Sequence, residues 1–188
     1  LSDSATPLLS YLNALGYSGT DPLDSSQTHQ GDVPMAVKVG AEPPSFSLLD
    51  QDRNPVTLDN LKGRKSLIVF IPFPFTGICD SEVCAIRDQL AALNDLDANV
   101  VVITCHATQV TKKWSDENQF TFPVLSDYWP HGVAATSFGA FNWDVGTANR
   151  MTFVLDDDGV VRTIIDSGSL GTPREFEEYV AALGEIDE

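Results

Sequence analysis

The sequence has few basic residues. Its 188 residues include 11 lysines and arginines against 27 aspartates and glutamates, which gives a formal net charge of −16 at pH 7. A surface this acidic repels phosphate backbones and anionic headgroups, so binding to nucleic acid or to a membrane surface is excluded as a function. We expect a substrate that is neutral, or one that meets positive charge placed locally in a site.

The sequence also lacks a long hydrophobic run. No apolar stretch approaches the ~20 residues that a helix needs to cross a bilayer, and the first residues, beginning at Leu1, contain no basic segment followed by an apolar leader. We therefore expect a cytoplasmic protein without a membrane anchor.

Cysteine is scarce, and the three cysteines are Cys79, Cys84 and Cys105. An odd number of cysteines in a chain of this length does not indicate a disulfide framework. It indicates a protein of a reducing compartment. The absence of a CxxC pair argues against a general dithiol oxidoreductase. The three histidines are scattered without zinc-ligand spacing, so we expect no metal site and interpret the adjacent Cys105-His106 as structural.

Two regions differ in composition. Residues 1–38 contain a segment with apolar residues at helical spacing (6–16), followed by a stretch rich in Gly, Pro, Ser and Asp that is typical of a linker. Residues 39–188 have the alternating pattern of a folded domain. We predict an N-terminal extension of unknown function followed by one domain.

Within residues 39–188, strand and helix patterns alternate. Continuous apolar runs indicate strands buried on both faces, and an Asp-Gly turn between apolar arms indicates a hairpin. The order predicts an α/β protein with a central mixed sheet flanked by helices, which is the thioredoxin-like order. The predicted strands are 45–49, 56–58, 66–73 and 99–105, the hairpin is 152–165, and the helices are 80–96, 109–118 and 172–184, the last capped by Thr172 with Pro173 at its first position.

Cys79 follows a buried strand and lies in the first turn of a predicted helix. The helix end has unpaired N–H groups and partial positive charge, which favour a thiolate; such positions lower a cysteine pKa from about 8.5 to about 3.5–7.5. Thr76 can place a hydroxyl beside the sulfur, Gly77 lets backbone amides approach a small ligand, and Pro72 shields the pocket from water. The plainer alternative is that Thr76 only caps the helix and Cys79 is an incidental small residue.

Pro72, Thr76 and Cys79 form the pattern PxxxTxxC, and the chain resembles the peroxiredoxins over about residues 39–184. It is most similar to the alkyl hydroperoxide reductase E group. The resemblance implies that Arg150 stabilises the thiolate and the peroxide oxygen. Glu82 either orients Arg150 or is an acid favoured in a first helical turn. The segments that carry the resemblance are TGIC (76–79), FTFP (120–123), LSDYWPHG (125–132), FGAFN (138–142) and ANRMTFVLDDDGVVR (148–162).

Cys84 departs from the alkyl hydroperoxide reductase E group, which is described as having one cysteine. Its spacing from Cys79 instead resembles the spacing in the bacterioferritin comigratory protein and peroxiredoxin Q group. In that group, the second cysteine of the helix resolves the oxidised first cysteine. Five helical residues place two Cα atoms roughly 8–9 Å apart, whereas a disulfide tolerates at most ~7 Å. We therefore hypothesise that the first turns of the helix unwind after oxidation. Alternatively, Cys84 is a buried structural thiol; Cys105 is expected to be inert.

The expected function is that of a thiol peroxidase. Cys79 would reduce hydrogen peroxide or a small organic hydroperoxide and become a sulfenic acid, which Cys84 would resolve as a disulfide. Thioredoxin would reopen the disulfide; without resolution by Cys84, a mycoredoxin or low-molecular-weight thiol would reduce Cys79 directly. No metal, flavin or haem is implied. The resemblance implies either a monomer or a dimer, and of the two we expect a homodimer. The alternative function is a peroxide sensor or redox-dependent binding module that uses the same cysteine.

Overall fold

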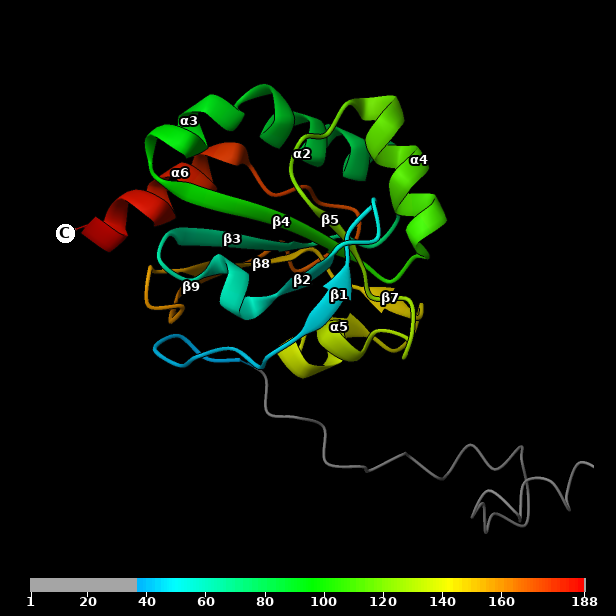
Figure 1. Ribbon diagram of the computed structural model, residues 1–188, viewed down its shortest axis with the longest axis horizontal. Helices are drawn as coiled ribbons and strands as arrows, with labels where there is room; N and C mark the ends of the chain where they lie inside the picture. Colours follow the sequence, from blue (N-terminus) through cyan, green and yellow to red (C-terminus); the bar gives the residue numbers. More distant parts are fainter. Residues whose placement is uncertain (1–36, 188) are drawn as a thin grey trace, which may run out of the picture. The chain divides into compact units, whose positions relative to one another are not determined.

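The computed structural model describes residues 37–187 (Figure 1). The helix predicted at 6–16 and the linker after it lie outside the described residues. No helix within the described range is long and apolar enough to cross a bilayer.

A seven-stranded mixed sheet forms the centre of the domain, as predicted. Its order is β2-β1-β5-β4-β3-β8-β9. The inner pairs β3–β4 and β4–β5 are parallel, and the remaining pairs are antiparallel. The strands are β1 (Ser47–Leu49), β2 (Pro55–Thr57), β3 (Lys65–Phe70), β4 (Ala98–Thr104), β5 (Val124–Ser126), β8 (Met151–Leu155) and β9 (Val161–Asp166); β6 (Phe141–Asn142) and β7 (Thr147–Ala148) form a separate two-stranded sheet.

Helices cover both faces of the sheet. In Figure 1, α2, α3, α4 and α6 lie on one side of the strands and α5 lies on the other. The helices are α2 (Gly77–Asp88), α3 (Leu90–Asp95), α4 (Thr108–Asn118), α5 (Val133–Phe138) and α6 (Phe176–Gly184), with short 3-10 turns η1 (Leu58–Leu61) and η2 (Glu185–Asp187).

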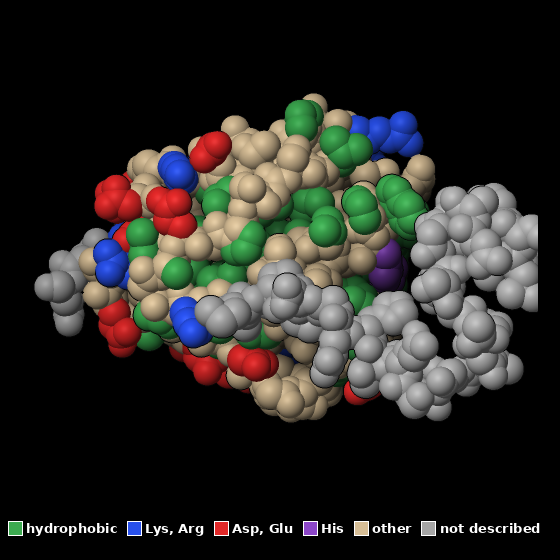
Figure 2. All heavy atoms as spheres, turned by 90° about the horizontal axis from the view of Figure 1, so that it is seen from below, with side chains coloured by type: hydrophobic (Ala, Val, Ile, Leu, Met, Phe, Trp, Pro, Cys, Tyr) green, Lys and Arg blue, Asp and Glu red, His purple; other side chains and the backbone are tan. Residues whose placement is uncertain are grey.

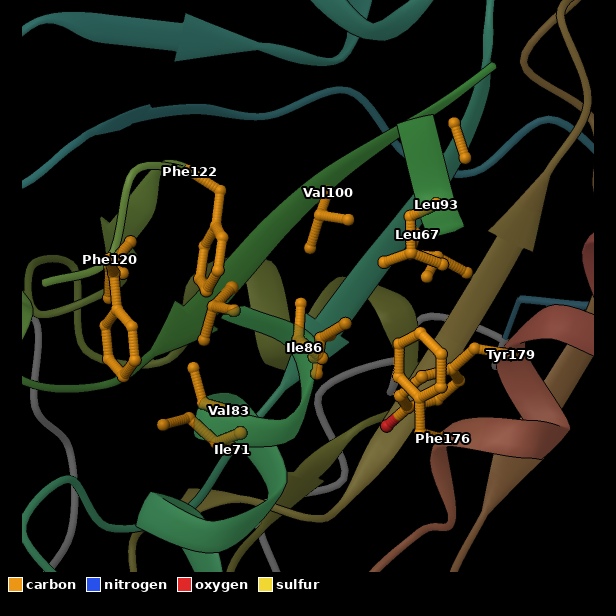
Figure 3. Packing of buried hydrophobic residues seen from close by; sticks show 14 of the residues in the cluster. Leu67, Ile71, Val83, Ile86, Leu93, Val100, Phe120, Phe122, Phe176 and Tyr179 are labelled. Carbon is orange, nitrogen blue, oxygen red and sulfur yellow. The ribbon is translucent and has the colours of Figure 1, made fainter. Parts of the chain in front are cut away.

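The two faces of the sheet have separate cores because successive side chains of a strand point in opposite directions. Leu67 and Val69 of β3 belong to the core beneath α2, whereas Ile68 and Phe70 belong to the core on the α5 side. Figure 3 shows the first core, in which residues of α2 lie among side chains of the sheet, of α3 and of α6. Helix α2 is therefore anchored along one apolar face.

Helix 80–96 was predicted as one continuous element, and that prediction is wrong in two respects. Helix α2 begins earlier, at Gly77, because the backbone is still extended at Thr76 (φ −113°, ψ 143°). The helix then breaks at Gln89 (φ −113°, ψ 19°), which separates α2 from α3. Both halves keep their apolar residues in the same core, which is why the periodicity resembled a single helix.

Helix α6 begins at Phe176 and not at Thr172. The backbone N–H of Arg174 donates to the Glu82 carboxylate at 2.8 Å, so this residue is held by a tertiary contact before the helix starts. Glu175 is the N-cap, and its N–H donates to the Glu178 carboxylate at 3.1 Å. The hairpin around Asp158-Gly159 formed as predicted, with Gly159 in the left-handed region (φ 84°).

Candidate active site

The thiol of Cys79 is fully buried in the first turn of α2, just after the segment that leaves β3. Its sulfur accepts a hydrogen bond from the backbone N–H of Phe73 at 3.4 Å. Cys79 belongs to the first turn of α2, whose amides are the unpaired donors and carry the partial positive charge of a helix start. This environment can stabilise negative charge on the sulfur.

The segment between β3 and α2 is held in an unusual backbone conformation. Phe75 has φ 64°, a left-handed conformation that costs a residue with a side chain about 1–2 kcal/mol. Strain of this kind persists only where the surroundings enforce it, and it concentrates at functional sites. Pro72 is buried, and its carbonyl accepts a hydrogen bond from the Thr147 hydroxyl at 2.7 Å, which ties the segment to β7.

Thr76 occupies the N-cap position of α2, but its side chain makes no capping hydrogen bond. Its hydroxyl instead donates to the Phe73 carbonyl at 2.7 Å. Phe73 therefore links the two predicted residues, because its N–H contacts the sulfur of Cys79 while its C=O holds Thr76. Gly77, the first helical residue, is exposed, and a side chain there would meet no atom within 4 Å.

Glu82 and Arg150 come together although they are 68 residues apart. Both are buried, and Nη1 of Arg150 donates to the Glu82 carboxylate. Nε of Arg150 donates to the carbonyl of Leu170 at 2.8 Å, which fixes the plane of the guanidinium. Glu82 lies three residues after Cys79, so the ion pair is next to the thiol along the helix.

Arg174 completes this cluster, although no pattern in the sequence marks it as a site residue. Its Nε donates to the other oxygen of Glu82 at 3.0 Å, and its Nη1 donates to the Thr152 hydroxyl at 2.9 Å. The side chains of Arg174 and Glu82 are 0% and 1% exposed. Two guanidiniums thus share one carboxylate, which leaves one net positive charge buried beside the N-terminal half of α2. Only the fold reveals this partner.

Cys84 is half-buried on the same unbroken helix as Cys79, and both are free thiols. Its Sγ donates to Oδ1 of Asn118 at 3.5 Å. Burial raises the pKa of the Cys84 thiol, an effect that neighbouring Arg87 partly offsets. Because α2 is intact between the two cysteines, it keeps their Cα atoms roughly 8–9 Å apart, which is beyond disulfide reach.

Cys105 belongs to the opposite side of the sheet. It is buried in the α5-side core, whereas Cys79 lies in the core beneath α2. Burial, assisted by the charge of Asp127, raises the pKa of Cys105 to about 12. Such a thiol is protonated and unreactive at neutral pH. His106 beside it is half-buried, with Nδ1 at 2.9 Å from the Thr104 hydroxyl, and burial lowers its pKa.

Comparisons with known proteins agree on one family. The model of the AhpC/TSA family matches residues 39–164. Alkyl hydroperoxide reductase E of Mycobacterium tuberculosis is 39% identical over 150 residues, which cover 78% of this chain and 98% of that protein. Chloroplastic peroxiredoxin Q of Sedum lineare is 31% identical over 138 residues, covering 70% of each chain.

Solved structures give the same result for the fold. The crystal structure of peroxidoxin BcpB from Mycobacterium tuberculosis aligns with a TM-score of 0.72 at 28% identity, over 80% of this chain and 98% of that one. AhpC of Enterococcus faecalis aligns with a TM-score of 0.74 at 24% identity, over 80% and 93%. The thioredoxin-like fold predicted from the sequence is confirmed.

Proposed function

Because the chain belongs to the AhpC/TSA family of peroxiredoxins and is a thiol peroxidase, we propose that Cys79 reduces hydrogen peroxide and small organic hydroperoxides. The single observation that carries this assignment is the position of its buried thiol. The sulfur lies at the start of α2, within reach of the Phe73 N–H, and three residues before Glu82, which binds Arg150 and Arg174. Both features favour the anionic sulfur that attacks a peroxide.

The first chemical step is a displacement at oxygen. The Cys79 thiolate attacks the nearer peroxide oxygen, the O–O bond breaks, and the leaving oxygen departs as water or an alcohol after taking up a proton. The sulfur becomes a sulfenic acid. Arg150 and the helix amides stabilise the charge that moves onto the leaving oxygen, while Thr76 and Pro72 position the peroxide. Glu82 holds the Arg150 guanidinium in place.

Cys84 then resolves the sulfenic acid, and a thioredoxin reopens the resulting disulfide. Support comes from the five-residue spacing and from the half-buried position of Cys84 on α2. The competing route is direct reduction of Cys79 by a mycoredoxin or a low-molecular-weight thiol. Either route needs a reducing compartment, which supports the predicted cytoplasmic location.

An exposed aromatic surface supports a homodimer. Trp129 and Trp143 are 83% and 72% exposed. Ring contacts from Tyr128 to His131, from His131 to Phe141 and from Phe141 to Trp143 join the side chains into one surface. Figure 2 shows hydrophobic side chains gathered close to a histidine on the side of the molecule below the sheet. Equilibrium sedimentation of wild type and Trp143→Ser tests this; a wild-type monomer at micromolar concentration would refute the dimer.

Stopped-flow oxidation of wild type, Cys79→Ser and Cys84→Ser tests the peroxidase scheme. Fast reaction should vanish only in Cys79→Ser, because that variant has no attacking sulfur. After one equivalent of peroxide, wild type should lose two thiols, whereas Cys84→Ser should hold a persistent sulfenic acid. Equal rates in wild type and Cys79→Ser would refute the assignment. Oxidation that stops after one turnover with a thioredoxin system, with a mycoredoxin and with a low-molecular-weight thiol would favour a sensor.

A further inference from the structure

Helix α2 presents a polar stripe to helix α4. Asp80, Cys84 and Arg87 are spaced i, i+4 and i+7, so they share one face of α2. All three contact the last turns of α4, where Trp114 and Asn118 are themselves four residues apart. We refer to Trp114 and Asn118 as the α4 clamp.

The strongest contact joins the α4 clamp to the residue directly after the reactive cysteine. Nε1 of Trp114 donates to Oδ1 of Asp80 at 2.7 Å, and the Trp114 side chain is fully buried. A buried indole N–H normally requires a partner, and a carboxylate is a strong one. The first turn of α2 therefore cannot unwind without exposing this indole or leaving its N–H unpaired.

Asn118 holds the next two turns of α2. Its Oδ1 accepts the hydrogen bond from the Cys84 thiol, and its backbone carbonyl accepts Nη1 of Arg87 at 2.8 Å. Asn118 is the last residue of α4, so its carbonyl has no intrahelical donor. Its Nδ2 donates to the Trp114 carbonyl at 3.0 Å, which connects the two members of the clamp.

We propose that the α4 clamp holds α2 closed and that its release is the step that allows Cys84 to reach oxidised Cys79. This inference rests on the proposed resolution by Cys84. While the clamp is closed, Cys84 is a hydrogen-bonded thiol on an intact helix and cannot form the disulfide. Breaking the Trp114–Asp80 bond frees the turn that carries Cys79, and breaking the Cys84–Asn118 bond frees the second sulfur. Trp114 and Asn118 are positioning residues that contact no reacting atom of the peroxide.

The step that the clamp controls is balanced without a further reagent. The Cys84 sulfur attacks the sulfenic sulfur of Cys79, an S–S bond forms and the S–O bond breaks. The thiol proton of Cys84 and the sulfenic OH leave together as water. The sulfenic sulfur is reduced while the Cys84 sulfur is oxidised.

Two variants at position 80 separate the effect of the Trp114–Asp80 hydrogen bond from the effect of the negative charge. Asp80→Ala and Asp80→Asn both remove the negative charge beside Cys79, but Asn keeps an oxygen that can accept from Trp114. Loss of one such hydrogen bond corresponds to about a fivefold change in the closed-to-open ratio. Amide hydrogen exchange of residues 78–88 in the reduced protein should therefore be about fivefold faster in Asp80→Ala than in Asp80→Asn. Alanine favours helix more than asparagine does, so propensity alone predicts the opposite order.

A double-mutant comparison assigns the effect to the indole N–H. Trp114→Phe keeps a ring in the core but removes the donor. It should accelerate exchange in the Asp80→Asn background and have little further effect in Asp80→Ala, because the hydrogen bond is already absent there. Equal acceleration in both backgrounds would show a packing effect and would overturn the proposal.

The rate of disulfide formation after a single peroxide pulse separates this inference from the proposed function. The clamp predicts faster formation of the Cys79–Cys84 disulfide in Asp80→Ala than in Asp80→Asn, measured by quenched alkylation and mass spectrometry. Equal rates in the two variants would overturn the clamp while leaving resolution by Cys84 intact. If wild type forms no disulfide, the proposed resolution fails, and with it the role given to clamp release.

Discussion

Two arginines share the buried carboxylate of Glu82, which lies three residues after Cys79 on α2. Removing one partner of a buried ion pair usually leaves an uncompensated charge and costs about 3–5 kcal/mol. Glu82 is protected from that outcome, since Arg150 and Arg174 bind different oxygens of its carboxylate. Arg174 can therefore keep the carboxylate satisfied while Arg150 is altered. In the reaction proposed above, Arg174 supports Glu82, while Arg150 stabilises the charge that moves onto the peroxide oxygen.

Replacing Arg150 should accordingly damage catalysis more than folding. In Arg150→Met, the rate constant of sulfenic acid formation should fall about 10²–10³-fold, which is typical for loss of a charge-stabilising donor. Arg150→Lys keeps the charge but loses the planar fork, so its loss should be smaller, about tenfold. Stopped-flow kinetics gives the rates, and thiolate absorbance follows the ionisation of the sulfur. A Met variant within twofold of wild type would contradict the role of Arg150.

Cys105 should make stability depend on pH in alkaline solution. Burial raises the folded pKa of this thiol from 9.0 to about 12, so the unfolded chain releases its proton first. The contribution is fully present below pH 9 and is lost as pH rises toward 12. Wild type should lose on the order of 3–4 kcal/mol more stability than Cys105→Ala over that range. Urea unfolding at several pH values measures the difference; parallel curves for the two proteins would exclude the effect.

Secondary-structure elements differ in how much of them the sequence specifies. The runs 66–73 and 99–105 were predicted as strands because both faces are covered, and β3 and β4 confirm this. Helix α5 and the β6–β7 pair were not predicted, because they are short. Helix α5 also depends on a side chain outside it, since Asp127 accepts from the N–H groups of Ala134 and Ala135. Dependence on such contacts also explains which residues of the candidate site could be predicted from the sequence. PxxxTxxC is local, whereas Arg174 and Asn118 acquire their roles from partners far away in the chain.

The C-terminus of α4 allows the effect of backbone conformation on stability to be tested. Gln119 adopts a left-handed conformation (φ 58°) and its N–H donates to the Ser115 carbonyl, so it ends the helix where glycine is usually found. Gln119→Gly removes strain of about 1–2 kcal/mol and adds unfolded-state entropy of about 0.5–1 kcal/mol. Net stabilisation should be about 0.5–1 kcal/mol in urea unfolding with an unchanged slope.

Alanine at the same position is the matched control for this change. Gln119→Ala keeps the left-handed strain because it still has a Cβ, so its midpoint should stay close to that of wild type. If alanine stabilised the protein as much as glycine, the gain would come from losing the exposed glutamine side chain, and the conformational explanation would be wrong.

The whole molecule combines a strongly negative charge with a positive site. The formal net charge is −16, yet Arg150 and Arg174 are buried and both bind Glu82, three residues after Cys79 on α2. At long range the acidic surface repels anions, and salt weakens that repulsion because the Debye length falls from about 10 Å at 0.1 M to about 3 Å at 1 M. Neutral peroxides approach without this penalty. We therefore expect the charge distribution to favour neutral over anionic peroxides before they reach Cys79.

Salt should therefore change the oxidation rate less with neutral peroxides than with anionic peroxides. The oxidation rate with hydrogen peroxide or cumene hydroperoxide should change less than about twofold between about 0.05 M and about 1 M KCl, since no long-range charge acts on them. A ring-carboxylated cumene hydroperoxide should react more slowly at low salt and gain severalfold as salt rises, because its repulsion by the protein is screened. Stopped-flow rates for the two cumene compounds provide the matched comparison. If the carboxylated compound instead slowed with salt, local attraction by the Arg150–Arg174 pair would outweigh the acidic surface, and the enzyme would favour anionic hydroperoxides.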